Sequence, residues 1–279
     1  MISAIIVNYK TVELTKKAVY AVRKSCEDAR IEFEIILIDN SAHETGNELK
    51  KALGNSVQLV FPETNLGFAR ANNLGASVAQ GKFLLLINND AFATKELILR
   101  SIEVLENEES VGLYAPSLVY EDQRPQRSTG RFLTLGTLAA EYLFPYRLAQ
   151  QFLGPHTYDP HYVPTVSGAC MVLKRDVYRD LQGFDERFFF TCEDIDLCRR
   201  VYKKDKKIYY DDSVVVTHLG GSSQPWNWIR DPYLHRARIR YIQKHFGLFQ
   251  ALLAKAIVAM GRLFRGVLSR SGRTRIVSQ

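Results

Sequence analysis

The chain has 279 residues, 46% of them hydrophobic and 24% charged, a length and composition that exclude a disordered chain and allow a substantial buried core. Its four cysteines occur without a C-x-x-C pair or zinc spacing, so reduced thiols are expected, as in a cytoplasm. The net charge of +7 is uneven, because residues 229–279 hold eleven Lys and Arg and one acid, which makes this tail +10 and the remainder −3.

The first half of the chain alternates short apolar runs with amphipathic segments. It opens directly on an apolar run without a basic n-region or cleavage site, so no signal peptide is expected. The alternation predicts a mainly parallel sheet with helices on both faces and functional residues at the carboxyl ends of its strands. Strands are predicted at 2–7, 34–38, 57–61 and 82–87, and helices at 12–23, 44–53, 68–79 and 95–106.

Polar residues directly follow three of these predicted strands. They are Asn8, Asp39 and the turn Asn88-Asn89-Asp90. Because carboxyl ends of parallel strands open on one crevice, we expect these side chains to lie close together. Burial of Asp90 is costly unless a cation or hydrogen-bond donors receive it, and Mg²⁺ commonly combines one or two carboxylates with substrate phosphates. Taken singly, each of these residues is equally typical of a turn.

The second half is less regular. Proline, glycine, tyrosine and arginine interrupt residues 120–164, where loops and one helix are expected. The next helix, beginning near Cys192, carries acids early and bases late, as suits the helix dipole. Strands are predicted at 165–173, 207–210 and 214–217, with a turn at 183–186 and His218 at the last strand end.

Two carboxylates and a histidine in this pattern indicate a chemistry. Asp90 and His218 are an oxygen and a nitrogen ligand suited to a metal that neutralises a diphosphate leaving group. The separate carboxylate of Asp194 could take a proton from an incoming hydroxyl. The alternative is structural: Glu193 and Asp194 as ordinary first-turn acids, and His218 as a hydrogen-bonded strand-end histidine.

Two further pairs of residues stay open between structural and ligand-binding roles. Arg70 and Asn73 fit a solvated helix face as well as ligand contacts. Trp226 and Trp228 follow a Gly-Gly-Ser-Ser segment and fit packing anchors as well as a sugar-stacking platform.

The tail from residue 246 to 268 is apolar but interrupted by charge. At about 100° per residue Lys255 and Arg262 share one face, which is too charged for a membrane-spanning helix. It fits an interfacial helix on an anionic membrane, or a terminal helix packed on the body of the protein. The first reading predicts peripheral attachment to the inner face of the cytoplasmic membrane. No nucleic-acid-binding module is recognised, so no nucleic acid partner is expected.

Several short motifs appear in a fixed order, and together the set is specific. The motifs are NLGFARANNLG (65–75), LLLINND (84–90), SGA (167–169), GFDE (183–186), FFTCEDIDLCR (189–199) and His218. With these motifs in this order, the chain resembles glycosyltransferase family 2, especially its rhamnosyltransferase-like branch in bacterial polysaccharide synthesis, over about residues 1–223.

The resemblance implies an α/β GT-A fold, a Rossmann-like, mixed and mainly parallel sheet flanked by helices, followed by the basic helical tail. It implies a catalytic domain at 1–225, with a nucleotide-binding half at about 1–120 and an acceptor half at about 121–225, before a tail at 226–279. The implied reaction is inverting transfer of a sugar from a dTDP- or UDP-sugar donor to a saccharide or lipid-linked acceptor, with Mg²⁺ or Mn²⁺ as cofactor.

The resemblance also carries roles to positions in this sequence. Asp194 is implied as the catalytic base, and Asp90 and His218 as the metal ligands. Donor-binding residues are Asn8, Asp39, Arg70, Asn73, Asn88 and Asn89, with Asp39 on the base. Acceptor-binding residues are Gly168, Glu193 and Trp228. Asn88 replaces the first acid of the usual D-x-D motif, which weakens the expected neutralisation of metal charge.

Two other functions fit parts of the pattern. A sugar-phosphate nucleotidyltransferase would share the fold, but residues 8–11 (NYKT) do not provide the basic glycine-rich loop that it normally uses. A non-catalytic scaffold on a degenerate transferase domain would account for the basic tail.

Overall fold

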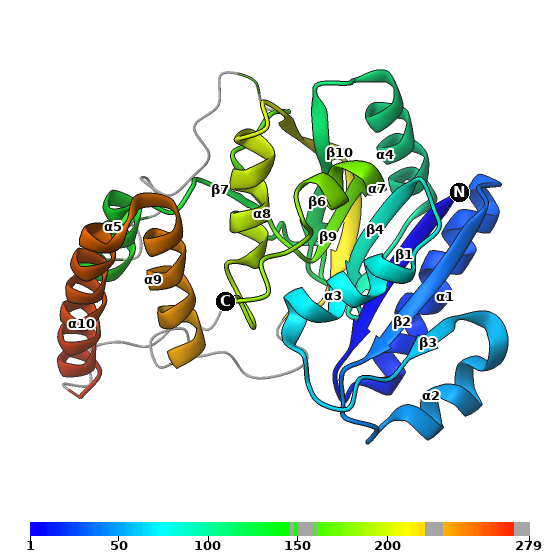
Figure 1. The fold of residues 1–279 in the computed structure, drawn as a ribbon, viewed down its shortest axis with the longest axis horizontal. Helices are drawn as coiled ribbons and strands as arrows, with labels where there is room; N and C mark the ends of the chain where they lie inside the picture. Colours follow the sequence, from blue (N-terminus) through cyan, green and yellow to red (C-terminus); the bar gives the residue numbers. More distant parts are fainter. Residues whose placement is uncertain (146–147, 150–158, 160, 221–230, 271–279) are drawn as a thin grey trace. The chain divides into compact units, whose positions relative to one another are not determined.

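The computed structural model describes residues 1–145, 148–149, 159, 161–220 and 231–270, of which 264–270 are described by backbone alone. The chain forms two compact units (Figure 1). The first comprises residues 1–130 and 155–225, and the second comprises 131–154 and 226–279. Residues 131–154 therefore group with the tail and not with the segments on either side of them in sequence.

An eight-stranded mixed sheet forms the centre of the first unit. The strand order is β3-β2-β1-β4-β9-β6-β10-β5, in which β9 is antiparallel to both neighbours and β5 to β10, while the other pairs are parallel. This confirms the predicted α/β fold with a mixed, mainly parallel sheet. The strands are β1 (Ile2–Asn8), β2 (Phe33–Asp39), β3 (Gln58–Val60), β4 (Phe83–Asn88), β5 (Ala91–Phe92), β6 (Val111–Val119), β9 (Cys170–Lys174) and β10 (Lys207–His218), and β7 (Thr129–Gly130) and β8 (Thr165–Val166) form a separate pair.

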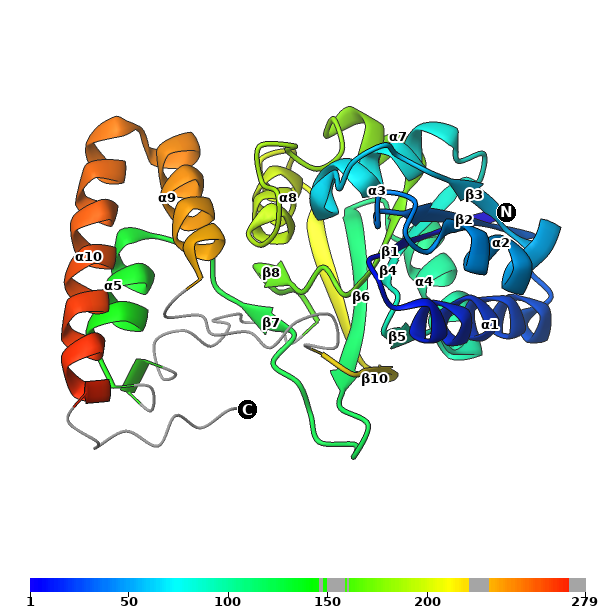
Figure 2. The same cartoon turned by 90° about the horizontal axis from the view of Figure 1, so that it is seen from below.

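Helices cover both faces of the sheet, as the alternating pattern predicts. Figure 2 shows α1 and α4 on one face and α3, α7 and α8 on the other. Burial on both faces explains why the central strands are apolar throughout and do not alternate. The helices of this unit are α1 (Val12–Ala29), α2 (Gly46–Leu53), the 3₁₀ turn η1 (Gly54–Ser56), α3 (Gly67–Val78), α4 (Lys95–Asn107), α7 (Arg175–Asp180) and α8 (Glu193–Tyr202).

Helix α3 lies close to the sheet because a glycine faces it. A Cβ atom on Gly75 would lie 2.5 Å from Cγ2 of Ile5 on β1, well inside any real carbon contact. Ile2, Ala4 and Ile6 of the same strand belong to the core cluster that includes residues of α1. Because successive side chains of β1 point to opposite faces of the sheet, both faces of this strand are buried.

The structure corrects three predicted strands. The strand expected at 165–173 is broken, because Ser167 donates its N–H to the Ser128 carbonyl and the chain re-enters the sheet only at Cys170. The two pieces at 207–217 are one strand, β10, with a register shift between Asp211 and Val215. Strand β6 was not predicted, since Pro116 interrupts its pattern; this proline lies opposite Asp211 at the bulge, where a missing ladder donor is tolerated.

Three helices form the described core of the second unit: α5 (Leu135–Leu143), α9 (Pro232–Phe246) and α10 (Leu248–Arg270). Tyr142 of α5 hydrogen bonds through its hydroxyl to Nδ1 of the buried His235 of α9 at 2.5 Å. A Cβ atom on Gly261 of α10 would lie 2.7 Å from Cβ of Tyr142. The predicted tail helix is therefore present and packs against α5. Among the described helices, none combines the length and apolar character that crossing a membrane requires.

Candidate active site

Three predicted site residues end neighbouring strands at one edge of the sheet. In the parallel register of β1, Asn8 lies opposite Asp39 of β2, and Val7 lies opposite Asn88 of β4. The carboxyl ends of these strands thus bring Asn8, Asp39 and the Asn88-Asn89-Asp90 turn to one place, as the sequence predicts.

Asp39 is held through one carboxylate oxygen and leaves the other without a donor. Its Oδ1 accepts hydrogen bonds from Nδ2 of Asn8 at 2.9 Å and from the hydroxyl of Thr45 at 2.7 Å. Its Oδ2 is buried and has no hydrogen-bond partner in the described part of the chain. Because an unsatisfied buried oxygen of this kind is unfavourable, Oδ2 is suited to accept a donor group of a ligand.

An aromatic side chain that the sequence did not single out borders this oxygen. A Cβ atom on Gly46 would lie 3.6 Å from Oδ2 of Asp39 and 2.9 Å from Cε1 of Phe61. Phe61 stacks on the His43 ring, with centroids 6.2 Å apart, and lies 4.7 Å from Nζ of Lys50. The absence of a Cβ at Gly46, the first residue of α2, thus allows the Phe61 ring to approach this part of the site, and no local sequence pattern indicates this.

Asn89 anchors the Asn88-Asn89-Asp90 turn to the N-terminal end of α1. Its Nδ2 donates to the hydroxyl oxygens of Thr11 at 2.6 Å and Thr15 at 3.0 Å, both from the start of α1. Thr15 in turn donates to Oδ1 of Asn8 at 2.8 Å. The side chains of Asn8 and Asn89 are thus used within the protein, where they fix the positions of Asp39 and Asp90.

Asp90 and His218 lie side by side. His218 Nε2 is 3.3 Å from Oδ1 of Asp90 and 3.4 Å from Nδ2 of Asn88. Gln126 donates from its Nε2 to the carbonyl of His218, so its Oε1 faces Nδ1 of the ring at 2.9 Å. Since that oxygen only accepts, Nδ1 carries a proton, and Nε2 is the ring nitrogen that faces Asp90 and Asn88. No local pattern indicates this role for Gln126, which is 92 residues from His218 in the chain.

This pair fits part of a divalent metal site. Among the described residues, no group of three or more His, Cys, Asp and Glu could hold a metal ion by itself. A carboxylate oxygen of Asp90 and Nε2 of His218 could nevertheless be two ligands of a metal ion whose coordination substrate phosphates complete. The Gln126 contact is of the kind that orients a metal-binding histidine from its second nitrogen.

Asp194 opens helix α8 and is joined to the same turn through two residues. The N–H of Gly168 donates to Oδ2 of Asp194 at 3.1 Å, and the carbonyl of Ala169 accepts from the N–H of Asn88 at 2.9 Å. A Cβ atom on Gly168 would lie 3.3 Å from Cβ of Asp194, so a glycine allows this close approach. Gly168 and Ala169 thus connect Asp194, the predicted base, to the end of β4, which Asp90 follows.

Burial raises the pKa values of Glu193 and Asp194, the first two residues of α8. Burial raises the pKa of Asp194, while hydrogen bonds from the N–H groups of Ile195 and Gly168 oppose the rise. Burial raises the pKa of Glu193 well above its usual value, and the neighbouring Asp194 raises it further. Oε2 of Glu193 is buried without a hydrogen-bond partner in the described residues. Asp194 thus has two backbone donors that favour its ionised form, whereas burial and the charge of its neighbour favour the protonated form of Glu193.

The turn that precedes α8 is strained and is held by α3. Thr191 and Cys192 both have φ of +69°, a conformation that is unfavourable for residues other than glycine. Phe189 accepts a hydrogen bond at its carbonyl from the N–H of Phe68 at 2.8 Å. Gly67 has φ of +75°, and a Cβ atom there would lie 2.3 Å from that carbonyl oxygen. The glycine is therefore required for the contact between α3 and this turn.

Arg70 and Asn73 also tie α3 to the segment before α8. Asn73 accepts from the N–H of Phe184 and donates to its carbonyl, both at 2.9 Å, and accepts from the Tyr178 hydroxyl at 2.7 Å. Arg70 pairs with Glu186 at 3.3 Å on the surface. Donor binding by either residue stays a prediction. Trp226 and Trp228 lie outside the described residues.

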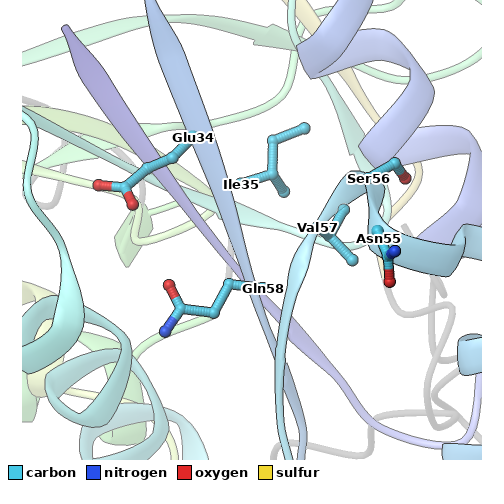
Figure 3. A pocket seen from close by; sticks show the side chains of 6 residues that line it. All are labelled: Glu34, Ile35, Asn55, Ser56, Val57 and Gln58. Atoms are coloured by element: carbon cyan, nitrogen blue, oxygen red, sulfur yellow. The ribbon is translucent and has the colours of Figure 1, made fainter.

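A shallow depression elsewhere on the first unit lacks comparable chemistry. Figure 3 shows its lining near the start of β2 and β3, the opposite ends of the strands from those of the site above. Its carboxylate, Glu34, already accepts hydrogen bonds from Ser3 at 2.5 Å and from the N–H of Gln80 at 2.6 Å. The lining residues are Glu34, Ile35, Asn55, Ser56, Val57 and Gln58.

The mixed sheet and its polar carboxyl edge define a GT-A-type transferase fold. The family model described as "Glycosyl transferase family 2" matches residues 3–182, and the chain belongs to that family. Phe83–Asn88 and the turn after it, on which the sequence resemblance partly rested, lie inside the matched segment. The predicted family is thereby confirmed.

The relatives by sequence are named for O-antigen biosynthesis and for rhamnosyl transfer. The chain is 26% identical over 200 residues to the O-antigen biosynthesis protein RfbC of Myxococcus xanthus, covering 69% of this chain and 15% of that protein. It is 34% identical over 94 residues to the N-acetylglucosaminyl-diphospho-decaprenol L-rhamnosyltransferase of Mycobacterium tuberculosis (strain CDC 1551 / Oshkosh), covering 32% of this chain and 29% of that protein. The matches thus span less than a third of either relative.

Solved structures share the fold at low sequence identity. GalNAc-T7 with UDP, GalNAc and Mn²⁺ superposes with a TM-score of 0.63 at 16% identity, covering 87% of this chain and 48% of that one. The mannosyltransferase PcManGT from Pyrobaculum calidifontis, with GDP-Man and Mn²⁺, gives 0.62 at 14%, covering 94% and 70%. S. aureus TarS 1–349 gives 0.56 at 16%, covering 100% and 75%. These likenesses confirm the GT-A fold.

Proposed function

We propose that the protein is an inverting glycosyltransferase of bacterial surface polysaccharide synthesis. It would move a sugar, with rhamnose as the first candidate, from a nucleoside-diphosphate sugar to a saccharide acceptor. The observation that carries the proposal is the Gly168-Ala169 bridge, which joins Asp194 to the turn bearing Asp90. The two relatives, an O-antigen biosynthesis protein and a rhamnosyltransferase, support the reaction class.

Asp194 would act as the general base. Its carboxylate would take the proton of the acceptor hydroxyl as that oxygen bonds to the anomeric carbon and the diphosphate departs from the opposite face, so that the configuration inverts. Glu193, holding a proton beside it, would keep a second negative charge away from the base and lie against the acceptor near Gly168.

The donor would bind at the sheet edge. Oδ2 of Asp39, which has no donor among the described residues, would accept the imide N–H of a uracil or thymine base, with Phe61 beside the ring. A dTDP- or UDP-sugar is therefore proposed. Asp90 and His218 would hold Mg²⁺ or Mn²⁺, which would supply positive charge for the diphosphate. Two structural neighbours, GalNAc-T7 and PcManGT, were solved with Mn²⁺, which supports this assignment.

The acceptor would be a saccharide, in particular a lipid-linked one, at the cytoplasmic face of the membrane. The decaprenol-linked substrate in the name of the Mycobacterium relative supports this class. The basic C-terminal segment supports peripheral attachment there, because clustered Lys and Arg are attracted to anionic lipids.

The test compares the protein with Asp194→Asn against a panel of nucleotide sugars and saccharide acceptors. Transfer by the parent protein should release nucleoside diphosphate and should fall by about 10²–10⁴-fold in the variant, the usual contribution of a general base. Nucleoside diphosphate should bind both proteins equally, since Asn keeps the acceptor for the Gly168 N–H. Near-parental turnover by the variant, or release of pyrophosphate, would overturn the proposal, the latter in favour of a nucleotidyltransferase.

A further inference from the structure

Helix α10 has two apolar faces, and its own unit covers one of them. The covered stripe recurs at three- and four-residue spacing, as expected for one side of a helix. It packs on α5, where Gly261 lies against Tyr142. The buried residues of this stripe are Ala251, Ala254, Val258 and Gly261.

The opposite side is also apolar and is exposed. Six large hydrophobic side chains there are between 41% and 74% exposed. At 3.6 residues per turn they fall within an arc about 140° wide, in which Ala256 and Ala259 occupy the remaining positions. Contiguous exposed apolar surface of this kind marks an interaction site. We name the six residues the outer face: Leu248, Phe249, Leu252, Leu253, Met260 and Leu263.

Charge distinguishes between the partners that could cover the outer face. Lys255 and Arg262 are exposed and lie about 20° apart around the helix axis, along one edge of the outer face. Residues 232–279 contain ten Lys and Arg and no Asp or Glu. A second copy packed on this face would bring cations together without an acid on the same segment to neutralise them, whereas anionic lipid headgroups supply that charge.

We infer that the outer face inserts into the surface layer of an anionic bilayer, with Lys255 and Arg262 reaching the lipid phosphates along its edge. Helix α10 then lies parallel to the membrane and keeps its inner stripe on α5. The sequence predicts an interfacial helix without naming the side that meets the lipid; the structure assigns the contact to the outer face and places Lys255 and Arg262 along its edge. The inference deepens the proposed function, since it names the surface that would meet a lipid-linked acceptor, but the binding itself stands apart from catalysis.

The test is sedimentation of the full chain with phosphatidylcholine vesicles and with vesicles containing equal parts of phosphatidylglycerol. The parent protein should bind the anionic vesicles, and Phe249→Gln/Leu252→Gln/Leu263→Gln should lower the bound-to-free ratio by about tenfold or more. Lys255→Gln/Arg262→Gln should lower it less and should reduce its salt dependence. Tyr20→Gln/Leu99→Gln, which alters exposed hydrophobic residues of the first unit, is the matched control and should bind as the parent does.

Three results would overturn the inference: no binding by the parent protein, equal binding by the triple variant, or a dimer in ultracentrifugation that the triple variant converts to a monomer without any vesicle binding. Circular dichroism and thermal unfolding show whether a variant is folded. If the triple variant fails to fold, Lys255→Gln/Arg262→Gln tests the outer face in its place. Turnover on a water-soluble acceptor separates the two proposals, because it should survive in the triple variant, while vesicle binding should survive in Asp194→Asn.

Discussion

At the scale of single residues, the site is built from polar atoms with unequal numbers of partners. Within the described part of the chain, Asp39 and Glu193 each leave one carboxylate oxygen without a donor, whereas Asp194 accepts two backbone N–H groups. Groups with protein partners are fixed in position, and groups without them are suited to a ligand or a proton. The adjacent carboxyl groups of Glu193 and Asp194 therefore lie in different environments.

The raised pKa of Glu193 predicts a pH-dependent stability. Its pKa is higher in the folded than in the unfolded protein, so the folded state binds the extra proton, and its contribution is fully present below the unfolded value and lost as the pH rises through the folded one. The free energy of unfolding of Glu193→Gln relative to the parent should therefore rise between pH 5 and pH 8, measured by urea unfolding. Glu63→Gln, an exposed control, should show a flat difference. A flat difference for Glu193→Gln as well would mean that the carboxyl group is ionised throughout.

Gln126 is predicted to act on metal binding through His218. Replacing it by Ala removes the acceptor that keeps the proton on Nδ1, so Nε2 would be protonated part of the time and less available to a metal. The apparent affinity for Mn²⁺ in the presence of nucleoside diphosphate should fall by about 10–100-fold, measured by calorimetry. Gln80→Ala, distant from the histidine, should keep the parental affinity, and an unchanged affinity in Gln126→Ala would remove His218 from the metal site.

At the scale of elements, α3 fixes the segment that leads into α8. Gly67, Asn73 and Arg70, spread over two turns of the helix, each contact the stretch between residues 183 and 190. The strained turn at Thr191 and Cys192 follows directly, so these contacts hold Asp194 where the Gly168 N–H can reach it. Helix α3 thereby fixes the position of the carboxylate that we propose as the base.

Asn73→Ala should show this coupling. It leaves the N–H and carbonyl of Phe184 and the Tyr178 hydroxyl without their partner, which should destabilise the protein by about 2 kcal/mol in urea unfolding. If α3 positions α8, kcat should fall more than the affinity for nucleoside diphosphate. Ser77→Ala, on the exposed side of the same helix, should change neither. A loss of nucleotide affinity with kcat unchanged would instead favour direct donor binding by Asn73.

The sequence predicted the alternating elements and the strand-end residues because both follow from local pattern. Hydrophobic period locates β1, β2 and β4, and parallel pairing then brings Asn8, Asp39 and Asn88 together without further information. Gln126 and Phe61 were beyond reach, since their roles depend on contacts between distant segments. Strand β6 was missed because its proline is acceptable only beside a bulge that another strand supplies.

At the scale of the whole molecule, the chain enters its second unit twice. Helix α5 arrives from the middle of the sequence and packs on α10, so its buried Leu138 and Tyr142 need the C-terminal segment to cover them. A boundary placed at residue 225 from the sequence separates the tail from the first unit but also separates α5 from its partner. Truncation at that boundary therefore exposes apolar surface that a complete second unit covers.

Two fragments test this organisation. The fragment 1–225 should aggregate, because it retains α5 without α9 and α10. The same fragment with residues 131–154 replaced by a short Gly/Ser linker should remain monodisperse by size-exclusion chromatography. It should also keep nucleotide binding, seen as a gain of about 2.7 kcal/mol in apparent stability at 100 times the dissociation constant. Because the site residues from Asn8 to His218 all lie in the first unit, aggregation of both fragments would mean that this unit needs the second to fold, and equal solubility would mean that α5 does not depend on α10.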